Sequence, residues 1–279
     1  MILTREIMGV LTLAILWINT LLIAAAALKQ AGELWRRGRK LRALRPGQEG
    51  EGLIEGRVEE GRGEGGAIAG YEIEQIGRAG AERAGRRAIH FSDRTFSGET
   101  FGGEITSGAT RIHVPAGEAE VWPERESVLR AAACEDAGAF ERVMTDARKA
   151  RGHVRKVRVF LGAGSPVWIG GSARSSDKGL EMSPGSDAPL LVSAIDPRAW
   201  IRGRVALGVL FAVSEIAIAG GVSWLVLVRP IFDGWQSKLG GALGLAFFLG
   251  VQPLGALVRD ALRPPSRAFV RNIWLEPRR

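Results

Sequence analysis

The sequence predicts an α+β membrane protein, in which a β-rich domain with a helical insertion is joined to three transmembrane helices. Apolar runs cover 7–28, 205–228 and 239–258. Short strand-like segments separated by Gly-rich turns occupy most of 46–197. A membrane-spanning helix needs about 20 apolar residues to cross about 30 Å of hydrocarbon. Each of the three runs is long enough to be a span.

These features divide the chain into consecutive parts. In order they are transmembrane helix 1 (1–28), a basic juxtamembrane helix (29–45), a cytoplasmic β-rich domain (46–197), transmembrane helix 2 (205–228), transmembrane helix 3 (239–258) and a basic C-terminal tail (259–279). The first run is interpreted as an uncleaved anchor rather than a signal peptide, because it is long and basic residues follow it closely.

The distribution of charge predicts the orientation. The chain has a formal net charge of +8 and a pI near 10.4, but its excess of positive charge flanks the apolar runs. Basic residues close to a span remain cytoplasmic, so the β-rich domain and the tail are expected inside and the N-terminus outside. The basic cluster of the juxtamembrane helix is expected to meet anionic lipid headgroups; it contains Arg36, Arg37, Arg39 and Lys40.

Composition also bears on the source and on the class of partner. Arg far outnumbers Lys and Gly and Ala are abundant, which favours a GC-rich bacterial gene and hence a multi-pass protein of the bacterial inner membrane. A nucleic-acid-binding protein should carry its basic patch on the folded domain. Here the central domain is mildly acidic, so no nucleic-acid partner is predicted.

Strands are predicted where apolar residues alternate between turn residues. The expected strands are 53–59, 67–76, 87–91, 110–114, 119–122, 156–161, 166–173, 179–183 and 190–193, with loops at 79–86 and 97–108. One or two amphipathic helices are expected over 126–151, broken at Gly138. A further helix over 34–44 is expected to continue the first span until Pro46 and Gly47 end it.

Several of these segments carry a family resemblance. They are GLIEGRVEE (52–60), AGYEIE (69–74), GATRIHVP (108–115), GEAEV (117–121), LGAGSPVWIGG (161–171) and PLLVS (189–193). In their order and amino-acid sequence they resemble the GIDE-type domain of membrane-anchored ubiquitin ligases, the mitochondrial-anchored protein ligase family. In that family a first span is followed by a β-rich domain, another span and a cytosolic RING. The cysteine expected shortly before Tyr71 and the RING itself are absent, so the resemblance does not imply ligase activity.

Residues that carry chemistry are few. Cys134 is the single cysteine, which excludes an internal disulfide and any zinc site with two or more thiolates. His90 and His113 alternate with apolar neighbours and are expected to face the surface of strands. The GAG of 162–164 precedes another strand rather than a helix, so it predicts a hairpin turn instead of a phosphate loop. No catalytic, cofactor-binding or metal-binding residue is predicted.

Three polar residues lie within the apolar runs: Asn19, Glu215 and Gln252. An ionised carboxylate near the centre of a span costs about 2.5–3.5 kcal/mol. Glu215 is therefore expected to be protonated and to hydrogen-bond to Asn19, at similar depth in the first span. Gly240 and Gly244 have a spacing that lets helices approach closely, either within the hairpin of the last two spans or in a homo-oligomer.

The predicted function is a non-catalytic, membrane-proximal interaction or scaffold module with an unidentified protein partner and no cofactor. Two alternatives remain open. The first is a divergent ubiquitin-ligase-related protein or a membrane hydrolase component, which a cluster of His90, Asp93 and Glu99 around a deep pocket would favour. The second is a small transport or sensing unit centred on Glu215.

Overall fold

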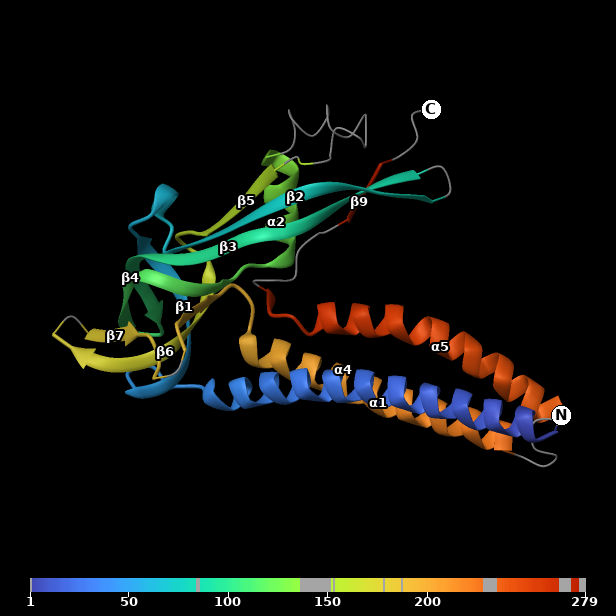
Figure 1. Cartoon of the computed structure of the whole chain (residues 1–279). Helices are drawn as coiled ribbons and strands as arrows, with labels where there is room; N and C mark the ends of the chain where they lie inside the picture. The colour runs from blue at the N-terminus through green and yellow to red at the C-terminus, as the bar shows by residue number, and fades with distance from the viewer. Residues whose placement is uncertain are drawn as a thin grey trace. The chain divides into compact units, whose positions relative to one another are not determined.

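A computed structural model describes residues 2–83, 86–135, 152, 154–177, 179–186, 188–227, 235–265 and 272–275 (Figure 1). Two compact units are present, and each is described by itself. The helical unit comprises Met1–Arg39 and Arg198–Arg263, and the β-rich unit comprises Lys40–Pro197 and Pro264–Arg279. The α+β class predicted from the sequence is confirmed.

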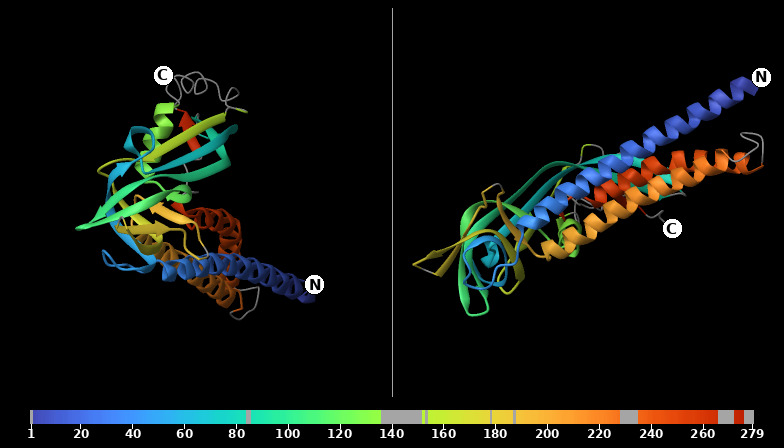
Figure 2. Two further views of the ribbon diagram at one scale, coloured as in Figure 1. Left: turned by 90° about the vertical axis from the view of Figure 1, so that its left-hand side faces the viewer. Right: turned by 90° about the horizontal axis from the view of Figure 1, so that it is seen from below.

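The helical unit consists of α1 (Ile2–Lys40), α4 (Pro197–Leu227) and α5 (Trp235–Ala261). All three helices are long and apolar enough to cross a membrane. They run side by side in each view of Figures 1 and 2. The turn predicted at Pro230 and Gly234 lies outside the described residues.

Small residues bring α1 and α4 together. The buried residues of each helix recur every three or four positions, which forms one stripe along a helix. On α1 the stripe is Leu16, Thr20, Ala24, Ala27, Ala31 and Leu34, and on α4 it is Gly208, Ala212, Glu215, Ala219, Val222 and Val226. Gly208 lies beside Ala31, where an added Cβ would be 3.0 Å from the alanine methyl carbon. This close approach is typical of membrane helices.

The β-rich unit contains a five-stranded barrel. Its strands are β1 (Gly50–Gly61), β3 (Arg86–Ser107), β4 (Thr110–Trp122), β6 (Pro166–Ser176) and β8 (Leu190–Ser193). Around the barrel the order is β3, β1, β6, β8, β4 and again β3, antiparallel except where β4 pairs with β8 in parallel. This is the Greek-key order of an OB-type barrel. The short β7 (Gly179–Ser183) joins β6 to β4 farther along.

Two strands extend the sheet beyond the barrel. β2 (Ala69–Arg83) pairs with β3, and β5 (Val154–Leu161) pairs with β2. The remaining elements are η1 (Glu64–Gly66), α2 (Arg125–Glu135) and β9 (Asn272–Leu275), which pairs with β3. The helix expected at the start of 126–151 is therefore present, while Gly138 and residues up to 151 lie outside the described part.

Alternation along the strands produces the core. In β5 every second residue is buried, including Val157, Val159 and Leu161. The largest fully buried side chains include Trp122, Tyr71 and Ile105. One polar pair shares this interior, since Arg155 Nε donates a 2.8 Å hydrogen bond to Gln75 Oε1 and both residues are buried.

The predicted loops at 79–86 and 97–108 are wrong. Residues 79–83 belong to β2, and β3 runs through 97–107. Glycines in the second segment suggested a turn. Gly103 instead allows β3 and β1 to approach closely. A Cβ atom there would lie 2.1 Å from the carbonyl oxygen of Glu60 on the neighbouring strand. The two strands expected at 110–114 and 119–122 are likewise one continuous strand, β4.

Two other expectations also need correction. α1 ends at Lys40 rather than Leu44, because Leu44 N–H bonds to the Leu53 carbonyl and Leu53 N–H bonds to the Arg42 carbonyl. That backbone therefore runs beside β1 instead of continuing the helix. The turn at 162–164 is present, with Ser165 N–H bonded to the Gly162 carbonyl. It does not form a hairpin, because β5 pairs with β2 whereas β6 pairs with β1.

Candidate functional site

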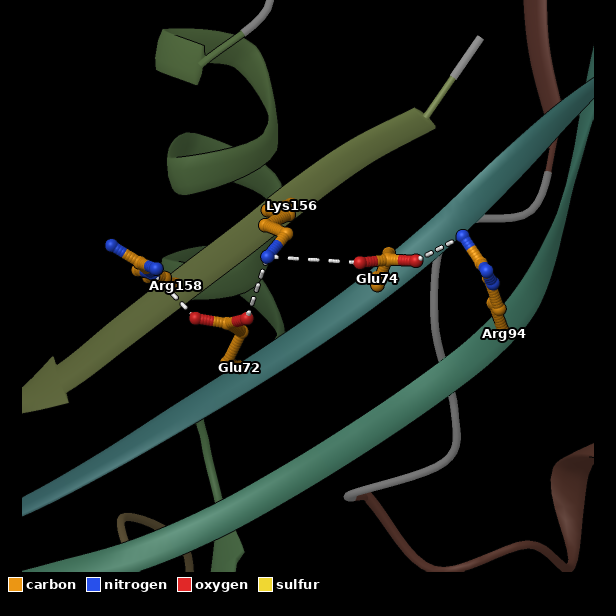
Figure 3. Close-up of polar contacts among 5 residues, drawn as sticks. All are labelled: Glu72, Glu74, Arg94, Lys156 and Arg158. Carbon is orange, nitrogen blue, oxygen red and sulfur yellow. Dashed lines mark hydrogen bonds and ion pairs between the residues drawn. The ribbon is translucent and has the colours of Figure 1, made fainter. Parts of the chain in front are cut away.

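A ladder of alternating charges crosses the outer face of β3, β2 and β5 (Figure 3). Arg94 Nη1 lies 2.9 Å from Glu74 Oε1, and Lys156 Nζ lies 3.7 Å from Glu74 Oε2. The same Lys156 Nζ lies 3.7 Å from Glu72 Oε1, and Arg158 Nε donates to Glu72 Oε2. We call these five residues the charge ladder.

Strand register explains why the ladder forms. Glu72 is directly opposite Arg158, and Glu74 is directly opposite Lys156. Residues two apart on a strand share one face, so both pairs point away from the core. Opposite charges on facing positions of neighbouring strands attract. Solvent-exposed ion pairs are worth only about 0–1 kcal/mol each, so the ladder adds little stability.

An aromatic groove lies next to the ladder. The rings of Phe101 and Phe160 are 6.1 Å apart between centroids and tilted by 43°. Phe101 covers Gly70, where an added Cβ would lie 2.7 Å from the ring. The groove has a volume of about 320 Å³. Its lining combines the two rings with polar and charged side chains, namely Glu64, Glu72, Ser97, Glu99 and Arg158.

The groove has an excess of acceptors. Glu72 is already paired with Arg158 and Lys156. Glu64 and Glu99 form no ion pair with any residue in the described part of the chain. Two free carboxylates beside two aromatic rings suit a Lys or Arg side chain, which can form an ion pair and also lie over a ring. Chemically, the arrangement is therefore a binding surface for a basic, partly apolar segment.

The histidine-containing set considered for an enzyme is not brought together. His90, Asp93 and Glu99 all lie on β3, opposite Arg78, Gln75 and Gly70 of β2. Nine residues of extended strand separate His90 from Glu99, which is roughly 30 Å at about 3.3 Å per residue. Glu99 lines the groove, whereas the side chains of His90 and Asp93 lie outside the described part of the structure. Within the described ranges, no three His, Cys, Asp or Glu side chains are grouped closely enough to hold a metal ion.

The other sequence candidates have separate places. His113 on β4 is half-buried between the fully buried Ile112 and Val114, as its alternation predicts. Cys134 lies in α2. Gly240 and Gly244 pack within the hairpin, because a Cβ atom on them would lie 2.9 Å from Val226 and 3.1 Å from Val222 of α4.

Comparisons with known protein families, with characterised proteins and with solved structures find no match. The resemblance to GIDE-type domains therefore remains a prediction that rests on the segments quoted above.

The expected hydrogen bond between Asn19 and Glu215 is not formed. Asn19 Nδ2 and Glu215 Oε2 are both buried and have no hydrogen-bond partner among the described residues. The cause is helix register. Trp17 of α1 contacts Ser223 of α4, and from that contact Asn19 is about 3 Å along its helix whereas Glu215 is about 12 Å along the antiparallel helix. The two side chains are thus offset by about 9 Å.

Asn19 lies instead near Gln252. Both line a cavity of about 320 Å³ among the three helices, together with Gln30 and Arg259. Glu215 is 3% exposed and belongs to the α1–α4 stripe rather than to this cavity. Asn19 and Gln252 therefore share a site, and Glu215 is separate from it.

The sequence interpretation did not identify the charge ladder or the groove. A signal was available, because Glu72 and Glu74 are two apart on one predicted strand and Lys156 and Arg158 are two apart on another. What was missing was the pairing of these strands, in which Glu74 faces Lys156 and Glu72 faces Arg158 across more than 80 residues of sequence.

Proposed function

We propose that this chain is a multi-pass membrane protein whose β-rich domain is a non-catalytic interaction module. Its partner is a protein that inserts a basic, partly apolar segment into the groove beside the charge ladder. Three helices long and apolar enough to cross a membrane support the first part of the proposal.

One observation carries the second part, namely the groove formed by Phe101, Phe160, Glu64 and Glu99. The aromatic rings supply apolar area and a face for a cation, and the carboxylates supply countercharge. The neighbouring ladder offers donors and acceptors in a fixed order, which favours one orientation of a bound segment.

The proposal includes a location and a family. The positive flanks of the spans support a β-rich domain on the cytoplasmic side of a bacterial inner membrane. The segments between 52 and 193 support a GIDE-like domain, in which the interaction surface rather than a ligase activity is retained. The basic cluster Arg36, Arg37, Arg39 and Lys40 supports a further association with anionic lipid.

A photo-crosslinking experiment on the full chain tests the interaction surface. A photoreactive amino acid replaces Ser97, which lines the groove, or Ser176, which is exposed on β6 outside it. Illumination of cells should give a discrete crosslinked product from position 97 and none from position 176.

A variant inside the groove makes the test specific. Glu99→Lys should abolish the product at position 97, because it places a cation where the partner's cation binds. Glu99→Gln should weaken it. A product that survives Glu99→Lys, or equal products from both positions, would refute the groove as the docking site.

A further inference from the structure

The helical unit contains a pocket with a cationic end and an apolar end. It lies between α1 and α4 and has a volume of about 640 Å³. Arg39, Arg198 and Arg202 line one part, together with Trp35. Val205, Ala206 and Val209 line the other part, farther along α4. About 10 Å of helix separates Arg202 from Val209, so the two ends are distinct.

Two arginines of this pocket, Arg39 and Arg202, are available to bind an anion. The described lining contains three Arg residues and no Asp or Glu. Arg39 and Arg202 form no ion pair with a described carboxylate. The guanidinium carbon of Arg39 lies 4.9 Å from the centroid of the Trp35 ring, which holds that charge beside the pocket. The positive charge of Arg39 and Arg202 at one end of the pocket therefore attracts anions.

The shape of the pocket selects the kind of anion. A guanidinium group binds phosphate oxygens in pairs through its parallel N–H groups. The valines and the alanine beyond the arginines offer no polar group to a small hydrated ion, but they can pack against an acyl chain. Basic pockets between membrane helices on the cytoplasmic side bind anionic headgroups in this way. Trp35 is of the type that marks the membrane–water interface.

We infer that this pocket binds one anionic phospholipid, with its phosphate on Arg39 and Arg202 and an acyl chain along Val205 and Val209. The inference rests on the membrane placement given under Proposed function, but not on the groove of the β-rich domain. It assigns lipid recognition to a defined pocket, whereas the flanking basic residues by themselves provide only diffuse attraction.

Native mass spectrometry of the full chain in a neutral detergent tests the inference. Phosphatidylglycerol is titrated against the protein, and phosphatidylcholine with the same acyl chains is the zwitterionic comparison. The double variant Arg39→Gln/Arg202→Gln should bind phosphatidylglycerol at least about tenfold more weakly, with unchanged binding of phosphatidylcholine. The matched control Lys29→Gln/Arg204→Gln removes the same charge from the same two helices outside the pocket and outside the basic cluster, and its affinity should stay within about twofold of the parent's.

Three outcomes would overturn the inference. Equal losses in the two double variants would show diffuse attraction, and no loss in either would show that the pocket binds no lipid. Displacement of phosphatidylglycerol by glycerol phosphate or inorganic phosphate at equal concentration would make the ligand a soluble anion.

Two further measurements keep the test decisive. If the Arg39→Gln/Arg202→Gln variant does not fold, Val209→Phe fills the apolar end without changing charge and should weaken binding of both lipids. Flotation with phosphatidylcholine vesicles tests the membrane placement separately, since parent and variants should all float. Failure of the parent to float would refute the membrane placement. A parent that floats but binds phosphatidylglycerol no more tightly than phosphatidylcholine would refute the pocket alone.

Discussion

Trp17 on α1 donates a 2.9 Å hydrogen bond from its indole Nε1–H to Ser223 Oγ on α4. The Ser223 hydroxyl in turn donates to the Ala219 carbonyl at 2.8 Å, so its one proton is used within α4 and its oxygen is available to the indole. This hydrogen bond joins α1 to α4, whereas the sequence suggested a bond between Asn19 and Glu215.

Replacing Trp17 by Phe should lower thermal stability in detergent, because the interhelical bond is lost and Ser223 Oγ loses its donor. Interhelical hydrogen bonds in membranes are worth about 0.6 kcal/mol on average and up to about 1.7. Trp224→Phe is the control, because Trp224 is 69% exposed. A double-mutant cycle with Ser223→Ala measures the pair directly, and a coupling energy of zero would contradict the assignment.

Glu215→Leu should preserve or raise thermal stability. The carboxyl is 3% exposed and its Oε2 has no partner among the described residues, so an apolar side chain of similar size removes a desolvation cost of about 1–3 kcal/mol. Glu215→Gln keeps a polar group there and should change stability less. Denaturation in detergent followed by circular dichroism compares the three chains. Strong destabilisation by Leu but not by Gln would show that Glu215 has a hydrogen-bond partner after all.

Gly240→Val should destabilise the pairing of α4 with α5. An added Cβ would lie 2.9 Å from Leu225 and Val226, and overpacking of this kind costs about 1–3 kcal/mol. Gly241→Val is the matched control, because nothing lies within 4 Å of a Cβ there. Both variants are compared by thermal denaturation and by size-exclusion chromatography with light scattering. If Gly240→Val dissociated an oligomer without lowering thermal stability, the glycine would belong to an interface between copies.

Gly103→Ala should damage the barrel more than Gly117→Ala. Both glycines have a positive φ, 152° and 158°, which an alanine adopts only with strain. They differ in surroundings, since a Cβ at Gly103 would lie 2.1 Å from the Glu60 carbonyl oxygen and one at Gly117 meets open space. The extra cost should be about 1–3 kcal/mol, measured by urea denaturation of the full chain in detergent. Equal costs would mean that β1 and β3 move apart easily.

The proposed membrane orientation is tested by thiol labelling. In a Cys134→Ser background, Ser186→Cys places a thiol on the exposed surface of the β-rich unit. An impermeant reagent should label it only after the cells are permeabilised. Asp233→Cys, between the last two apolar runs, should be labelled in intact cells. The opposite pattern would reverse the assigned topology.

Local spacing was sufficient to predict the three long helices and several of the strands. Runs of about 20 apolar residues predicted α1, α4 and α5, because a helix of that length matches about 30 Å of hydrocarbon. Alternation of apolar residues predicted β7 at 179–183 and β8 at 190–193 with the observed bounds, since period-two alternation is a property of neighbouring residues. Where glycine replaced that alternation, as at Gly103, the prediction of a loop was wrong.

The candidate site could not be predicted in the same way. Glu72 and Arg158 lie on strands whose partners are decided by the closure of the whole sheet, which depends on many side chains far apart in the sequence. The groove also requires that the ring of Phe101 on β3 lies over Gly70 on β2, on the outer face of the sheet.

By itself, the sequence determined the kinds of element, the apolar faces and the distribution of charge along the chain, because each follows from spacing and composition over a few turns or strands. Only the tertiary structure decided the parallel pairing of β4 with β8, the charge ladder and the contact of Trp17 with Ser223. The physical reason is register. A shift of six residues between two helices moves a side chain by about 9 Å, and this offset is why Asn19 and Glu215 do not meet.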